Sequence, residues 1–141
     1  METKEFFKNW KSDSPKSFEE FEKYLKKYNL MFETNYNDDI RIIMNFFFIK
    51  KPLTDISEWQ CLIFEFEMLT GVIEKFFEDN HIIITIKFQD NQFYNYIDFI
   101  NDNIEIEKLY HSGKWYMNKK DCQIMAYLKA VEILEKELLN E

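Results

Sequence analysis

The histidines and cysteines are the side chains best suited to metal binding or nucleophilic catalysis, and the sequence holds two of each. His81 and His111 lie far apart in the chain, and neither has further ligands at the fixed spacing that a metal site needs. Cys61 and Cys122 both fall in segments with helical apolar spacing, where free cysteines usually fill the core. We therefore expect no metal, no cofactor and no catalytic residue, and the chain is not expected to be an enzyme.

Carboxylates are the other abundant groups that could take part in catalysis or bind metal ions. The sequence holds 26 acids against 18 lysines and arginines. Asp90, Asp98 and Lys87 are of the types that two-metal nucleases place at strand ends. An acidic chain brings carboxylates near strand ends by default, so a solvated surface is the favoured interpretation. An enzyme with an unrecognised carboxylate site remains an alternative.

The acidic excess gives a net charge of −8, and Arg41 is the only arginine. Such a charge repels nucleic-acid phosphates and anionic membranes and favours basic partners. Direct nucleic-acid binding and membrane association are therefore not expected, although a single-strand nucleic-acid or small-ligand binding module stays an alternative. No apolar run resembles a signal peptide or a membrane span, and two cysteines are typical of a reducing compartment. We expect a cytoplasmic protein and leave its oligomeric state open.

Residues 94–116 interleave aromatic with acidic side chains. Tyrosine and tryptophan are favoured interface anchors, and acids around them attract a basic protein partner. The alternative is that Tyr94, Tyr96 and Trp115 pack the sheet against the last helix. The candidate partner-binding residues are the acidic cluster of Asp98, Asp102, Glu105 and Glu107, together with Tyr110, Trp115 and Tyr116.

Hydrophobic periodicity predicts an α+β fold in a single domain over residues 1–141, with elements in the order α-β-β-α-β-β-α. Ser17 and Glu20 have capping-box spacing at the start of the first long helix, and Ser57 begins the second. The expected parts are an N-terminal extension (1–16), two α-β-β units (17–52 and 53–101), and an acidic irregular loop with a closing helix (102–141). The expected strands are 30–36, 40–49, 82–88 and 93–100, and the closing helix is 119–139.

A shift of 52 positions lays residues 21–49 on residues 73–101 without a gap. Few residues are identical, and the shared feature is the order helix, strand, turn, strand. Two origins stay open, a duplication of an α-β-β unit and the convergence of amphipathic segments. Either origin predicts a four-stranded, mainly antiparallel sheet with helices packed on it.

Two segments carry a resemblance, LTGVIEKFFEDNHIIITIKF and GKWYMNKKDCQIMAYLKAVEILEKELL. Over about residues 69–139 the chain resembles small uncharacterised proteins of phages and mobile elements, especially in Bacteroidetes. The shared features are a helix that leads into a short strand pair, and a tyrosine-bearing turn before a closing helix. The basic, tryptophan-rich face that such proteins often show is absent here. The resemblance implies that this chain comes from a phage or mobile element, and it implies no activity.

Small size, acidity and this setting favour an inhibitor that acts by binding another protein. An immunity protein, an antitoxin and a phage-encoded anti-defence protein of the anti-CRISPR type all belong to this class. Their targets are proteins with a basic, nucleic-acid-handling surface, which an acidic surface can occupy. The sequence therefore predicts a protein-binding inhibitor directed at such a partner.

Overall fold

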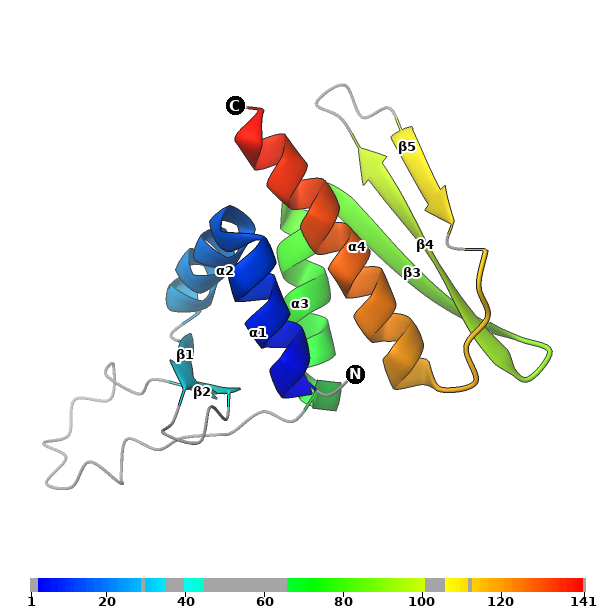
Figure 1. Cartoon of the computed structure of the whole chain (residues 1–141), viewed down its shortest axis with the longest axis horizontal. Helices are drawn as coiled ribbons and strands as arrows, with labels where there is room; N and C mark the ends of the chain where they lie inside the picture. Colours follow the sequence, from blue (N-terminus) through cyan, green and yellow to red (C-terminus); the bar gives the residue numbers. More distant parts are fainter. Residues whose placement is uncertain are drawn as a thin grey trace, which may run out of the picture.

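In this computed structural model the backbone is described for residues 3–28, 30–34, 40–44, 66–100, 106–111 and 113–140, and side chains for 5–28, 30, 69–100 and 113–140. The described elements follow one another in the chain as α1 (Thr3–Asp13), α2 (Pro15–Lys27), β1 (Leu30–Thr34), β2 (Ile40–Met44), α3 (Phe66–Asp79), β3 (Ile82–Gln89), β4 (Gln92–Ile100), β5 (Ile106–His111) and α4 (Lys119–Leu139) (Figure 1). The α+β class predicted from the sequence is confirmed. None of the described helices is long and apolar enough to span a membrane.

The described strands form two sheets, and the expected single four-stranded sheet is not confirmed. β1 and β2 make a two-stranded antiparallel sheet, while β3, β4 and β5 make a three-stranded antiparallel sheet in that order. The difference arises at β4, whose second edge is taken by β5. The residues of β5 were expected to form an irregular loop, so this strand was missed.

The two hairpins have different registers, so the internal duplication is not confirmed. Leu30 pairs with Met44, and the shift of 52 positions would place Ile82 opposite Tyr96. The structure instead pairs Ile82 with Phe99. The second hairpin turns through two residues, Asp90 and Asn91, between the paired Gln89 and Gln92.

The turn between β3 and β4 depends on two residues that tolerate a left-handed backbone. Asp90 has φ 53° and Asn91 has φ 61°, as the tight turns that suit a twisted hairpin require. Asp and Asn adopt this conformation more readily than other non-glycine residues. The two-residue turn fixes the register of β3 against β4, and with it the face on which each side chain lies.

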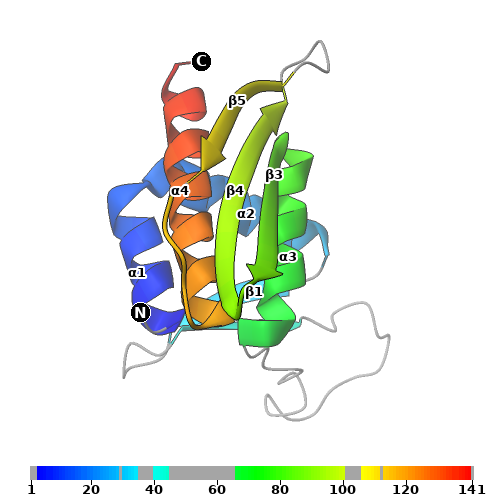
Figure 2. The same ribbon diagram turned by 90° about the vertical axis from the view of Figure 1, so that its right-hand side faces the viewer.

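α3 and α4 cover one face of the three-stranded sheet, and α1 and α2 pack beyond them. Figure 2 shows the sheet face-on, with the helices behind it. Aromatic rings fill much of the core, and Trp10 of α1 contacts Phe21 of α2 with ring centroids 4.7 Å apart and Phe77 of α3 at 5.8 Å. The N-terminal segment therefore supplies part of the core in addition to extending the fold.

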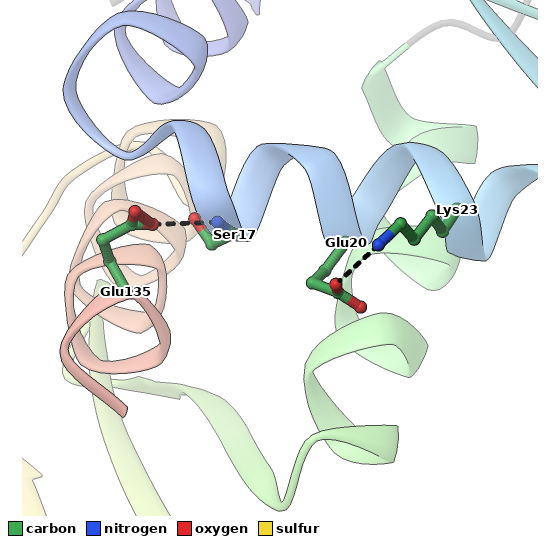
Figure 3. A network of polar contacts seen from close by, with 4 residues as sticks. All are labelled: Ser17, Glu20, Lys23 and Glu135. Atoms are coloured by element: carbon green, nitrogen blue, oxygen red, sulfur yellow. Dashed lines mark hydrogen bonds and ion pairs between the residues drawn. The ribbon is translucent and has the colours of Figure 1, made fainter. Parts of the chain in front are cut away.

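The start of α2 differs from the predicted capping box. Ser14 occupies the N-cap position and Pro15 follows it, so Ser17 lies inside the first turn. The Ser17 hydroxyl accepts a hydrogen bond from the Trp10 indole N–H at 2.8 Å. The cap comes from α4, because the Glu135 carboxylate accepts hydrogen bonds from the backbone N–H groups of Lys16 (3.0 Å) and Ser17 (2.8 Å) (Figure 3).

The closing helix is confirmed at Lys119–Leu139. It begins where the Asn118 side chain accepts hydrogen bonds from the N–H groups of Lys120 (2.8 Å) and Asp121 (3.3 Å), which satisfies two otherwise unpaired donors. Glu132 and Lys136 also form an ion pair on this helix, at 3.5 Å. The start predicted for the second helix, Ser57, lies outside the described residues, which begin again at Phe66.

Candidate protein-interaction surface

The alternation of side chains along β4 separates a helix-facing side from an outer side. Asn95 is only 1% exposed, and its side-chain amide donates to the backbone carbonyl of Cys122 in α4 at 3.3 Å. Ile97 is fully buried on the same side. Tyr94 and Tyr96 therefore lie on the outer side, which faces the viewer in Figure 2 and carries none of the described helices.

Three aromatic rings form a continuous row on this outer side. Trp115 contacts Tyr94, with ring centroids 4.9 Å apart and planes inclined by 57°. Tyr94 contacts Tyr96 at 6.4 Å with the planes inclined by 28°. Trp115 is 46% exposed, a large fraction for a tryptophan. These three side chains, called the aromatic face below, do not pack between the sheet and α4, contrary to the alternative raised from the sequence.

The backbone next to Trp115 is held on its C-terminal side. Tyr116 and Phe93 exchange two hydrogen bonds, N–H to carbonyl, at 2.7 and 2.8 Å. Two residues further on, Asn118 caps α4. Trp115 is therefore exposed directly beside a hydrogen-bonded residue of the sheet.

Lys87 adds a positive charge to the aromatic face. Its ammonium lies 5.7 Å from the centroid of the Tyr96 ring, within cation–π range. Lys87 is the register partner of Tyr94 on the neighbouring strand. From the sequence, this lysine was a candidate only in the nuclease-like group with Asp90 and Asp98. The alternation of β3 and β4 together with their two-residue turn was the signal that could have placed it here.

The acidic cluster begins on the same side of β4, two residues beyond Tyr96. Asp98 is half-buried and pairs in register with Ile83 of β3 and Leu109 of β5. Asp102 and Glu105 lie outside the described residues, in the segment that connects β4 to β5. The outer side of β4 therefore runs from aromatic residues at one end to a carboxylate at the other.

The remaining candidate residues lie on β5 and after it. Glu107 and Tyr110 belong to β5, where the backbone of Tyr110 pairs with that of Ile97. Tyr116 is half-buried and pairs with Phe93, which lies on the helix-facing side of β4 with Asn95 and Ile97. The structure thus places Asp98 and Trp115 on the outer side and Tyr116 opposite a residue of the other side.

The titratable groups beneath the sheet are buried structural groups. Burial raises the pKa of the Cys122 thiol, while its contact with the Asn95 amide acts in the opposite direction. Burial also raises the pKa of Tyr127, whose hydroxyl lies beside Glu74. Cys122 is fully buried, as predicted, and Cys61 lies outside the described residues. Among the residues whose positions are described, no three His, Cys, Asp or Glu side chains are grouped to hold a metal ion.

Comparison of the chain with protein-family models, with curated proteins and with solved structures gives no significant match.

Proposed function

We propose that this chain is a small acidic inhibitor that binds another protein through the outer side of its three-stranded sheet. The partner carries a basic surface of the kind that handles nucleic acid, and binding occupies that surface. The proposal includes a setting in the cytoplasm and a source in a phage or mobile element, where the inhibitor is of the anti-defence, immunity or antitoxin type. The resemblance described above supports this setting.

The observation that carries the proposal is the exposed contact between Trp115 and Tyr94 on a sheet side without described helices. A tryptophan that is 46% exposed still holds much apolar surface for a partner to cover. Hot spots at protein interfaces are enriched in tryptophan and tyrosine and lie near the centre of the contact. The two backbone hydrogen bonds between Tyr116 and Phe93 hold the chain next to this pair.

The charges supply the preference for a basic partner. The chain carries a net charge of −8. Asp98 lies on the same outer side of β4 as Tyr94 and Tyr96, and the rest of the acidic cluster follows it in the chain. Complementary charge steers association and raises the association rate, while buried anchors set the dissociation rate. The aromatic face and the acidic cluster would therefore act on different rates of the same binding reaction.

A second candidate function is single-strand nucleic-acid binding, because of one specific contact. The Lys87 ammonium lies over the ring of Tyr96, next to Tyr94 and Trp115. Aromatic rows with a nearby cation stack bases with little sequence preference. Against this function stands the net charge of −8, since affinity for phosphates rests on positive charge.

Affinity capture with matched baits tests the proposal. The wild-type chain, Trp115→Ala and a control, Tyr28→Ala, are immobilised and exposed to nuclease-treated extract of the source cells. Tyr28 is 54% exposed at the C-cap of α2, a helix that contacts α4 and β1, and so it matches Trp115 in exposure away from the three-stranded sheet. We expect a basic protein that the wild-type chain and Tyr28→Ala retain and Trp115→Ala loses. Equal retention by all three baits would place the interface elsewhere.

Two further measurements separate the electrostatic part and the nucleic-acid alternative. Raising salt from about 0.05 to 0.5 M should slow association of the wild-type chain and affect a variant with the acidic cluster reversed to lysine much less. Salt-independent association would contradict the proposed steering. Titration with a fluorescent oligothymidylate measures direct nucleic-acid binding. Micromolar affinity that Trp115→Ala abolishes would favour the second candidate over the first.

A further inference from the structure

The strand β3 is the edge of the three-stranded sheet, and half of its backbone groups point away from β4. The backbone N–H of Ile100 donates to the carbonyl of His81 at 2.9 Å, so the backbone carbonyl of His81 points towards β4. Backbone groups alternate in direction along an antiparallel strand. Ile82, Ile84, Ile86 and Phe88 therefore direct their N–H and C=O groups to the outer edge, and no described strand lies beside that edge.

The usual protections of an edge strand are scarce in β3. Natural edges are short, charged, bulged or interrupted by proline. β3 is eight residues long, has no proline, and pairs with β4 without a bulge. It contains none of the 26 acids of the chain, and Lys87 is its one charged residue. This edge of a strongly acidic chain therefore carries no carboxylate of its own.

From this edge we propose that β3 pairs antiparallel with β3 of a second copy, with the two-fold axis at Thr85. In this register Thr85 lies opposite its own counterpart, and Lys87 lies opposite Ile83. The outward-directed backbone groups of Ile84 and Ile86 face each other, as do those of Ile82 and Phe88. The interface is self-complementary, because each residue of one strand meets the same partner in the other.

Side-chain environment supports this register on the helix-facing side. Ile84 and Ile86 are half-buried against the core, and Phe88 is 62% exposed. Pairing with a second β3 covers their remaining exposed surface with other apolar side chains. Cross-strand pairs of β-branched and aromatic residues stabilise a sheet.

Charge selects this register over the neighbouring one. The allowed registers differ from one another by an even number of residues. An odd shift would place an outward-directed residue of one strand opposite an inward-directed residue of the other, and no hydrogen bond could form between them. A shift that puts Ile86 on the axis brings Lys87 of one copy diagonal to Lys87 of the other. Like charges at that spacing destabilise a strand pair. With Thr85 on the axis the two lysines lie about 13 Å apart along the strands, from four residue steps.

The pairing would make one six-stranded sheet from two copies. A two-fold axis perpendicular to the sheet keeps both outer sides on the same side of it. Two aromatic faces would then point in one direction, which permits bivalent binding to a partner that is itself two-fold or repetitive. The dimer does not depend on the proposed function, because it uses the strand edge and not the sheet face.

Disulfide cross-linking tests the register directly. In Thr85→Cys the two introduced thiols lie on opposed residues whose Cα atoms are about 4.5 Å apart, close enough for a disulfide. The control Lys87→Cys is on the same strand and side, but its thiols are too far apart. Under mild oxidation we expect Thr85→Cys to form the covalent dimer at least about tenfold faster than Lys87→Cys. Peptide mapping confirms that the bond joins the two introduced cysteines. Equal rates, or no covalent dimer, would overturn the register.

Sedimentation equilibrium tests the dimer without oxidation. The wild-type chain should associate as its concentration rises through the micromolar range. Thr85→Lys places two ammonium groups opposite each other on the axis and should shift the chain to monomer. Gln89→Lys changes the net charge equally and lies outside the seven paired residues, so it should remain a dimer. A wild-type chain that stays monomeric, or a Thr85→Lys variant that dimerises like the wild type, would overturn the proposal.

Discussion

Replacing Glu135 should destabilise the fold more than replacing any neighbouring acid of α4. Its carboxylate accepts the N–H groups of Lys16 and Ser17 at 3.0 and 2.8 Å, and the residue is only 9% exposed (Figure 3). In Glu135→Ala both N–H groups lose their acceptor in a site that water reaches poorly. A hydrogen bond to a charged group contributes about 1.5–3 kcal/mol, and helix caps measured by deletion contribute about 0.5–2 kcal/mol.

These ranges give an expected loss of about 2–3 kcal/mol in the free energy of unfolding for Glu135→Ala. Glu135→Gln keeps one acceptor oxygen and loses the charge that interacts with the N-terminal end of α2, so about 1–2 kcal/mol is expected. The control is Glu132→Ala on the same helix. Glu132 is exposed and pairs with Lys129 at 3.3 Å and Lys136 at 3.5 Å, and such pairs contribute about 0.5 kcal/mol or less.

Urea denaturation followed by circular dichroism measures these differences, and the three variants should rank Glu135→Ala, Glu135→Gln, Glu132→Ala in decreasing loss. In thermal unfolding each kcal/mol corresponds to about 3 °C for a chain of this size. If Glu135→Ala were no less stable than Glu132→Ala, the carboxylate would not cap α2. The contact between the beginning of the chain and α4 would then rest on apolar packing alone.

Two further predictions concern buried groups. Burial raises the pKa of the half-buried Glu74 above its ordinary value, so ionisation of this group costs stability as the pH rises from that ordinary value through the folded-state pKa. Glu74→Gln should therefore gain stability relative to the wild type as the pH rises from about 4 to 7, which thermal melts at several pH values measure. A constant difference across this range would contradict the assignment. Cys122, fully buried with a raised pKa, should react with a thiol reagent only after unfolding, and rapid modification of the native chain at this residue would be inconsistent with the core position.

Elements set by local signals were predictable from the sequence. The α4 boundaries follow from apolar periodicity and from Asn118, and the β3–β4 hairpin follows from alternation and from the Asp90–Asn91 turn. β5 has no such signal, because its short, charged segment becomes a strand through pairing with β4. The cap of α2 could not be predicted from the local sequence, because its acceptor Glu135 lies 118 residues away from Ser17.

The composition of the aromatic face was predictable from the sequence. The side of β4 on which its tyrosines lie was less so. Tyr94 and Tyr96 were identified as a pair, but alternation alone does not say which side of β4 faces the core. Asn95 occupies a buried position that an apolar residue usually fills, because α4 offers its amide a backbone acceptor. The apolar pattern of the whole strand favours this orientation, because Phe93, Ile97 and Phe99 share the helix-facing side with Asn95. The polar Asn95 in the middle of that side weakens the signal.

The dissociation rate of the captured basic protein from Trp115→Ala is the measurement that tests the central claim most directly. Surface-immobilised wild type, Trp115→Ala and Tyr28→Ala are compared at one salt concentration, together with their melting temperatures. We expect Trp115→Ala to dissociate about 30-fold faster, the effect of losing a hot spot of about 2 kcal/mol, with a melting temperature lowered by less than about 3 °C. Tyr28→Ala should match the wild type. An unchanged dissociation rate for Trp115→Ala, or a large fall in its melting temperature, would show that this tryptophan is not the anchor of an interface.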